Sequence, residues 1–334
     1  MSIDSILKYF YSGLNSPDLL TNILFIIVYA IIISLLVSVF AYLFGWVERK
    51  LIAKSQYRHG PTYVGKYGIF QNLADLIKLI TKQKVVPENA DVLLLNIAPI
   101  LLVGITILVI LLIPFSSYLQ ATNFGLGLLT VFVLLGFTPL LLFVAGYASG
   151  GKFAQIGAQR SVLMLVSYEI PMIFVIATVG FAAGSYSLSG IVNMQSNLFY
   201  AFLMPLGLVI FFIAMLAELE RSPFDLREAD SELIAGWLTD ISAPYYALAL
   251  MLDYMRMFMG SLLIVILFFG GWSGPILPGI VWLILKAVIV SLFIILIRVS
   301  LVRMRIDKIL KVGWMYLLPL ALINLLITFI IVIR

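Results

Sequence analysis

The chain has 334 residues, of which 63% are hydrophobic and only 11% are charged, and its formal net charge is +5. About a quarter of the residues of a soluble domain are charged, so this composition excludes a water-soluble globular protein and predicts that lipid is the main solvent. The sequence has no cysteine and one histidine, His59, so we expect no catalytic side chain, no metal site and no covalently bound cofactor in this chain.

Eight apolar runs are long enough to cross a bilayer, since a helix needs about 20 apolar residues for a core of about 30 Å. They cover residues 19–45, 92–115, 124–148, 162–182, 198–217, 245–270, 276–297 and 312–333. Prolines within several of these runs, among them Pro139, Pro171, Pro205 and Pro319, predict kinks. The expected fold class is an all-α integral membrane protein, a single transmembrane domain over residues 1–334 with eight transmembrane helices.

Most of the 21 lysine and arginine residues lie in alternate connections between these runs. The basic connections are about 46–91, 149–161, 217–244 and 298–311, whereas the other connections contain neither residue type. The positive-inside rule then predicts that the four charged loops are cytoplasmic and that both termini lie outside. We expect a multi-pass protein of a prokaryotic plasma membrane.

The first charged loop contains a predicted amphipathic helix at about 68–84. Ile69, Leu73, Leu76 and Ile80 recur at helical spacing, with polar residues on the other faces. Such a helix lies in the plane of the membrane surface. It either contributes to a site or only anchors the loop.

The third charged loop, 217–244, is rich in carboxylates. Apolar residues such as Phe224 and Trp237 alternate with the acids, and the first acid follows a span directly. The acids are Glu218, Glu220, Asp225, Glu228, Asp230, Glu232 and Asp240. Such a run is often only a solvated face, but carboxylates packed at a membrane surface repel one another and can exchange protons near neutral pH.

Four charged residues fall well inside predicted spans: Glu169, Asp253, Arg256 and Lys286. Ionisable groups inside a membrane are costly and by default indicate an ion or proton path. Asp253 and Arg256 are three residues apart on one helical face, so they can form an ion pair that only holds helices together. Lys286 could serve as a counter-ion to either acid. From the residues alone, a proton translocator and an ion-coupled transporter are equally good interpretations.

Four ordered motifs resemble the H subunit of complex I, which corresponds to subunit 1 of the mitochondrial enzyme. The first joins Glu48-Arg49-Lys50 to residues 58–75 (RHGPTYVGKYGIFQNLAD). The second is 157–160 (GAQR) with 167–169 (SYE), and the third begins at 217–226 (AELERSPFDL). The fourth combines Lys286 with 303–307 (RMRID), Gly313-Trp314 and 318–320 (LPL).

The resemblance implies a membrane subunit that forms part of a quinone site and couples quinone reduction to proton translocation. Carried over by position, the quinone-pocket residues are Arg49, Arg58, Asp75, Arg221, Phe224, Asp225, Glu228 and Glu232, and the proton-path residues are Glu169, Glu218, Glu228, Asp253 and Lys286. It also implies peripheral-arm partners that carry the Fe–S clusters and complete the quinone site, small membrane subunits, antiporter-like subunits and membrane lipid. We expect no nucleic-acid partner.

The sequence departs from the family pattern at several positions. Glu220 stands where the family commonly has Asn, Asp253 where it has Glu, and Arg256 is unusual beside the acid. These departures suggest an archaeal or divergent prokaryotic enzyme, which could oxidise a reduced deazaflavin coenzyme and use ubiquinone, menaquinone or methanophenazine. The alternatives are the homologous subunit of a membrane-bound energy-converting hydrogenase, which the intact stretch Val64–Gln71 disfavours, and an ion-coupled transporter.

Overall fold

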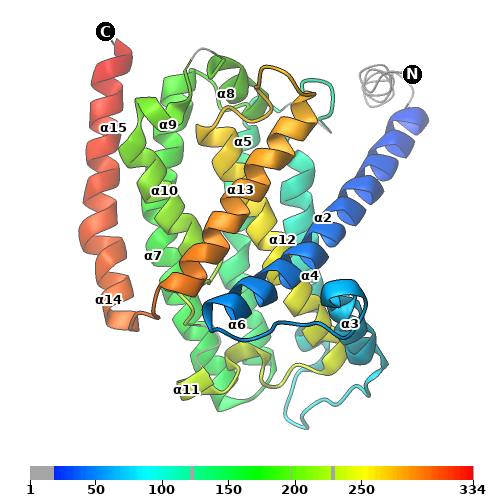
Figure 1. Cartoon of the computed structure of the whole chain (residues 1–334). Helices are drawn as coiled ribbons and strands as arrows, with labels where there is room; N and C mark the ends of the chain where they lie inside the picture. The colour runs from blue at the N-terminus through cyan, green and yellow to red at the C-terminus, as the bar shows by residue number, and fades with distance from the viewer. Residues whose placement is uncertain (1–18, 121–123, 197, 227–229, 334) are drawn as a thin grey trace.

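The computed structural model describes residues 19–120, 124–196, 198–226 and 230–333, and in these segments it is helical with no strand (Figure 1). The longer helices are α2 (Leu19–Ser55), α3 (Gln71–Thr81), α4 (Val92–Leu112), α5 (Gly127–Leu135), α6 (Phe137–Ala148), α7 (Lys152–Ala183), α10 (Pro205–Glu218), α12 (Ala243–Phe268), α13 (Gly279–Ser300) and α15 (Leu318–Ile333). Shorter helical segments are η1 (Lys66–Gly68), α8 (Leu188–Met194), α9 (Tyr200–Leu203), α11 (Asp230–Leu233), η2 (Gly236–Leu238), α14 (Ile306–Lys311) and η3 (Val312–Leu317).

Seven of the predicted spans are confirmed as apolar helical segments long enough to cross a membrane within the described part of the chain. The eighth, predicted at 198–217, is divided into α9 and α10 at Met204. Proline disfavours the helical conformation of the residue before it, and Met204 precedes Pro205 and has an extended φ of −134°. The predicted kink at this proline is therefore a helix break.

A second predicted span, 124–148, is divided at Gly136 into α5 and α6. Pro139 lies four residues after Leu135, the last residue of α5, and it has no N–H to donate to the Leu135 carbonyl. The main-chain hydrogen-bond ladder is therefore interrupted near Glu169, whose Oε1 is 3.9 Å from the place where a Cβ on Gly136 would stand, while the backbone of Gly136 stays helical.

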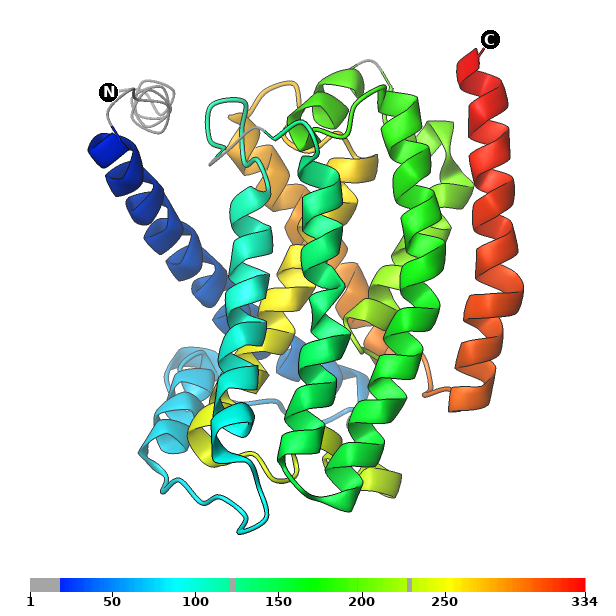
Figure 2. The same cartoon turned by 180° about the vertical axis from the view of Figure 1, so that it is seen from behind.

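Helix α2 is much longer than the 19–45 span that hydrophobicity predicts. Its 37 residues correspond to about 55 Å at 1.5 Å per residue, well beyond an apolar core of about 30 Å. Figures 1 and 2 show α2 strongly inclined to the other long helices: its first turns stand apart from the bundle, and its last turns cross the lower part of the bundle toward the end of α13. This extension carries Glu48 and Arg49 to the same end as the charged loops.

Helix α12 is the centre of the bundle. It packs against α2, α3, α4 and α13, and most of its C-terminal half is fully buried. Helix α7 has the same role on the other side, where it contacts α6, α10 and α15. The chain from Leu19 to Ile333 begins and ends at one end of the bundle, and α3, α11 and α14 lie at the opposite end (Figure 1).

The predicted amphipathic helix is confirmed as α3, which is shorter than the predicted 68–84. Its start is limited because Tyr67 and Gly68 have positive φ values of 60° and 71°. A side chain at Gly68 would collide with the Pro61 carbonyl oxygen at 2.1 Å. The glycine is needed there because the loop 58–66 folds back tightly under α3.

Candidate functional site

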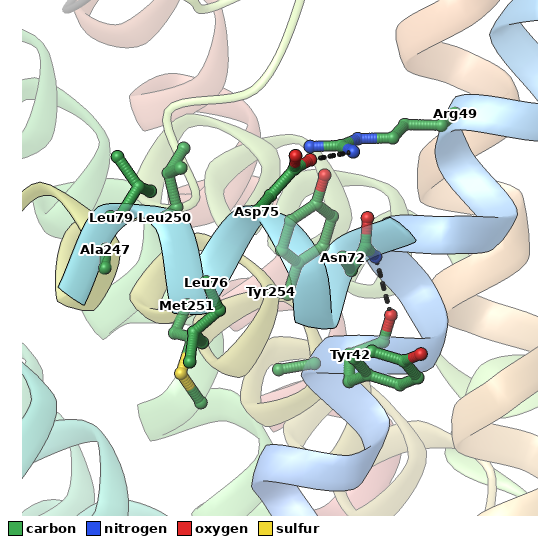
Figure 3. Close-up of a pocket in the computed structure, with 11 residues that line it drawn as sticks. Tyr42, Arg49, Asn72, Asp75, Leu76, Leu79, Ala247, Leu250, Met251 and Tyr254 are labelled. Atoms are coloured by element: carbon green, nitrogen blue, oxygen red, sulfur yellow. Dashed lines mark hydrogen bonds and ion pairs between the residues drawn. The ribbon is translucent and has the colours of Figure 1, made fainter. Parts of the chain in front are cut away.

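A hollow of about 110 Å³ lies where α2, α3 and α12 meet, and we call it the α3 hollow (Figure 3). Helix α12 supplies Ala247, Leu250, Met251 and Tyr254, and α2 and α3 supply Ala41, Tyr42, Arg49, Asn72, Asp75, Leu76 and Leu79. The lining is therefore largely apolar with a polar group of side chains at one side. A predominantly apolar pocket with a few placed polar groups is typical of a small-molecule site.

The polar side of the α3 hollow is built around Asp75. Arg49 Nη1 donates to Asp75 Oδ2 at 2.6 Å, and Gln71 donates to the other carboxylate oxygen at 3.1 Å. Burial opposes ionisation of Asp75, but the hydrogen bonds from Arg49 and Gln71 and the charges of Arg49 and Lys78 outweigh it and lower the pKa of Asp75. Asp75 therefore remains ionised at neutral pH.

A second hollow, of about 770 Å³, lies under the loop after α2, and we call it the loop hollow. Its lining is Arg49, Ile52, Arg58, His59, Gly60, Pro61, Thr62, Tyr63 and Gln71. Arg58 donates to Gln56 at 2.7 Å and is exposed. Because Arg49 lines both hollows, the loop hollow and the α3 hollow adjoin at that side chain.

A third hollow, of about 90 Å³, lies behind α12, and we call it the acid hollow. Its lining is Leu219, Glu220, Arg221, Asp225, Leu250, Asp253, Tyr254 and Arg298. A water needs about 10–15 Å³ of such space, so several waters fit among these charged groups. Leu250 and Tyr254 line both the acid hollow and the α3 hollow, so one layer of side chains separates the two.

Glu48 holds the acid hollow together. Its two carboxylate oxygens accept hydrogen bonds from Arg221 and Arg298, and the Glu48 residue is only 2% exposed. The Arg221 guanidinium also lies over the ring of Tyr254, 4.9 Å from its centroid. Helices α2, α12 and α13 and the loop after α10 are thus joined through one buried carboxylate.

Arg256 contacts two of the predicted acids, Glu218 and Glu220, rather than pairing only with Asp253 on α12. Its Nη2 donates to the main-chain and side-chain oxygens of Glu218, the latter at 3.2 Å. Its Nη1 is 3.5 Å from Glu220 Oε2. The predicted pairing with Asp253 is therefore not the main contact of this guanidinium, since its two Nη groups are directed to α10 and the residues after it.

Glu169 and Lys286 lie apart from the three hollows. Glu169 Oε1 is buried on α7 and has no hydrogen-bond partner within the described segments. Lys286 Nζ donates to the carbonyls of Phe269, Gly271 and Ser273 at 2.7, 3.1 and 2.8 Å. An ammonium group has three N–H donors, so the suggested role of Lys286 as a counter-ion to Glu169 or Asp253 is wrong: it closes the turn after α12.

Of the remaining predicted pocket residues, Phe224 and Glu232 line none of the three hollows, and Glu228 lies outside the described part of the chain. Phe224 is buried with its ring edge-on to Tyr168, 5.1 Å between centroids. Glu232 accepts from Arg160 and lies 3.8 Å from Arg303, and the hydrogen bond from Arg160 together with the Arg303 charge lowers the pKa of Glu232.

Sequence reasoning assigned no role to three residues that organise the site: Glu48, Arg298 and Tyr254. Glu48 belongs to the first motif and Arg298 was counted only as a cytoplasmic charge. Tyr254 follows Asp253 directly, and a tyrosine beside a membrane acid was the one available signal. Their importance depends on contacts between residues up to 250 positions apart in the chain, which spacing does not reveal.

The comparisons with known proteins agree on one family. The NADH dehydrogenase family model matches residues 27–329. The NADH-quinone oxidoreductase H subunit of Dehalococcoides mccartyi is 37% identical over 303 residues, which cover 91% of this chain and 86% of the relative. The corresponding proteins of a Geobacillus species and of Bacillus cytotoxicus are 38% identical over 287 residues, which cover 84% of this chain and 86% of each relative. The chain therefore belongs to the NADH dehydrogenase family, which includes the H subunit of NADH-quinone oxidoreductase.

Proposed function

We propose that this chain is the membrane subunit of a complex I-type, quinone-reducing proton pump, in which it forms the membrane side of the quinone site and anchors the peripheral arm. The substrate is a quinone (ubiquinone or menaquinone) or the phenazine carrier methanophenazine. The Fe–S clusters belong to the peripheral-arm partners, and small membrane subunits and antiporter-like subunits complete the pump. The protein lies in a prokaryotic plasma membrane with its charged loops in the cytoplasm and both termini outside.

The observation that carries this proposal is that the three hollows adjoin one another through shared lining residues. The loop hollow meets the α3 hollow at Arg49, and the α3 hollow meets the acid hollow at Leu250 and Tyr254. A quinone combines a long apolar tail with a polar ring. A mainly apolar hollow between an interfacial helix and two spans, with Arg49 and Asp75 on its wall, suits such a molecule.

The acid hollow supports the coupling part of the proposal. Reduction of a quinone adds negative charge, and charge in a low-dielectric region acts strongly on nearby carboxylates. The Arg221 guanidinium contacts Tyr254 on one side and Glu48 on the other. A change of charge or position in the α3 hollow can therefore reach Glu48 and the acid hollow, which Asp253 lines. The proposed proton path consists of Asp253 with Glu218, Glu228, Glu169 and Lys286.

The decisive test is the substitution Asp75→Asn in the intact complex. It removes the carboxylate charge from the α3 hollow while it keeps the size of the side chain. We expect the KM for a short-chain quinone to rise about fivefold, because an ion pair as exposed as this one contributes on the order of 1 kcal/mol. Turnover at saturating quinone should be preserved.

Lys82→Gln is the matched control, since Lys82 is an exposed charge just after the same helix. It should leave the quinone KM unchanged. An unaltered KM in the Asp75→Asn complex would remove the α3 hollow from the quinone site. Copurification of a NiFe subunit would instead support the hydrogenase interpretation, and a single chain that transports ions unaided would support the transporter.

A further inference from the structure

Arg256 divides its contacts between two carboxyl groups. It lies in the middle of α12 with a side chain that is 4% exposed, and Glu218 and Glu220 are equally buried, with side chains 1% and 0% exposed. The guanidinium is 3.2 Å from Glu218 Oε1 and 3.5 Å from Glu220 Oε2. One fixed positive charge therefore stands between two acids that are two positions apart in the sequence.

The backbone at Glu220 is shaped to make this contact. Glu220 has a φ of +50°, in the left-handed region that favours glycine and asparagine. Its main-chain N–H donates to the Ala217 carbonyl, which ends α10 and turns the chain back toward α12. A charged residue that retains such a conformation in a buried position points to a function for its side chain.

The electrostatic consequence depends on the permanence of the arginine charge. A guanidinium does not lose its proton in proteins, whereas each carboxyl group can gain or lose one. The nearby cation stabilises the ionised form of whichever carboxylate it contacts more closely. Glu218 and Glu220 therefore compete for Arg256, and a small movement of the guanidinium strengthens its contact with one carboxyl group and weakens its contact with the other.

We propose that Glu220 and Arg256 act as a pair of positioning residues that keeps Glu218 able to bind and release a proton. Glu220 draws part of the Arg256 charge away from Glu218, so Glu218 is neither fixed as an ion nor left without a cation. In the transfer step a proton passes from the carboxyl oxygen of a protonated acid to a carboxylate oxygen of another acid, and Arg256 keeps its positive charge. This inference rests on the proposed function and concerns one step within it.

Single substitutions should perturb Glu218 in opposite directions. Glu220→Asn removes the competitor and suits a positive φ, so Arg256 contacts Glu218 alone and Glu218 stays ionised. Arg256→Met removes the cation, so Glu218 stays protonated. In both variants we expect the protons pumped per quinone reduced to fall at least about fivefold, the lower limit for a typical coupling between sites. Quinone reduction by uncoupled vesicles should change less than about twofold.

The double variant E220N/R256M decides the question. Because Glu220 acts on Glu218 through Arg256, its substitution should have no further effect once Arg256 is removed, so we expect the double variant to pump like Arg256→Met rather than to lose more. Redox-difference infrared spectra should show the carbonyl band of a protonated carboxyl group lost in Glu220→Asn and regained in the double variant. A merely structural role would lower pumping and assembly together and would not move this band.

The controls separate this inference from the proposed function. Ser261→Ala alters another buried polar residue of α12 and should pump normally, and Glu220→Gln, which changes a single atom, should reproduce Glu220→Asn if the latter fails to assemble. Additive losses in the double variant, or normal pumping in both Glu220 variants, would overturn the inference. A wild-type complex that reduces quinone without pumping would instead overturn the proposed function.

Discussion

Two arginines from different elements converge on Glu48. Arg221 comes from the loop after α10 and Arg298 from the end of α13, and each binds one oxygen of the carboxylate. A buried carboxylate is tolerated only when opposite charges and hydrogen bonds compensate it. Arg221 depends on Glu48 in the same way, because a buried guanidinium also needs an opposite charge to compensate it.

Glu48→Gln should therefore destabilise the protein. It leaves Arg221 buried with a neutral acceptor, and loss of one partner of a buried ion pair costs about 3–5 kcal/mol. We expect a clearly lower unfolding temperature of the purified complex in detergent. Glu88→Gln is the control, since Glu88 is exposed and such substitutions change stability by less than about 0.5 kcal/mol. Equal unfolding temperatures for the two variants would show that Glu48 does not hold the acid hollow together.

The sequence predicted which residues are charged within the membrane but not which partners they contact. The three-residue spacing of Asp253 and Arg256 indicated a pair, yet the guanidinium reaches Glu218 and Glu220 on another segment. Lys286 suggested a counter-ion, yet it binds three carbonyls of a turn. A long side chain can reach several neighbours, and only the packing of helices decides among them.

At the scale of elements, the contact of α2 with α3 and α12 depends on a glycine. A Cβ on Gly45 would stand 2.7 Å from Asn72 Nδ2 and 3.3 Å from the Tyr254 ring. Asn72 Nδ2 donates to the Tyr42 carbonyl at 2.9 Å, which fixes α3 against α2 (Figure 3). The width of the α3 hollow is set by this close approach.

Gly45→Ala should consequently push α3 and Tyr254 outward and alter the α3 hollow. Overpacking of this kind costs about 1–3 kcal/mol, so we expect weaker binding of quinone-site inhibitors with the complex still assembled. Gly104→Ala is the matched control because a Cβ at Gly104 on α4 meets nothing within 4 Å. Inhibitor binding that is equal in both variants would show that the α3 hollow does not contribute to the quinone site.

Hydrophobic periodicity predicted the helices well and their interruptions less well. The spans and α3 follow from apolar composition and spacing, which are properties of local sequence. The break at Met204 and the interruption at Gly136 were predicted only as kinks, since a proline does not reveal whether a helix bends or stops. The π-helical segment Val312–Leu317 was not predicted, because its contact with α7 through Gly313 is tertiary.

At the scale of the whole molecule, the charged loops gather at one end of the helix bundle, opposite the end where Leu19 and Ile333 lie (Figure 1). An even number of membrane crossings produces this arrangement. The positive-inside rule then predicts that the charged end is cytoplasmic.

Cysteine labelling can test this orientation directly, because the chain contains no cysteine of its own. Ser55→Cys at the charged end and Ser196→Cys at the opposite end introduce one exposed thiol each. We expect a membrane-impermeant thiol reagent to label Ser196→Cys in right-side-out vesicles and Ser55→Cys in inside-out vesicles. The reverse pattern would place the charged loops outside the cell.

The inclination of α2 has a consequence for how a hydrophobic substrate reaches the site. Because the first turns of α2 stand apart from the bundle (Figure 1) and α3 packs against both α2 and α12, the proposed quinone would approach the α3 hollow from the acyl chains and not from bulk water. A quinone dissolved in the bilayer could then enter the α3 hollow with its ring first, without leaving the membrane. The concentration of quinone in the membrane, rather than its negligible solubility in the cytosol, would then determine the rate at which quinone binds.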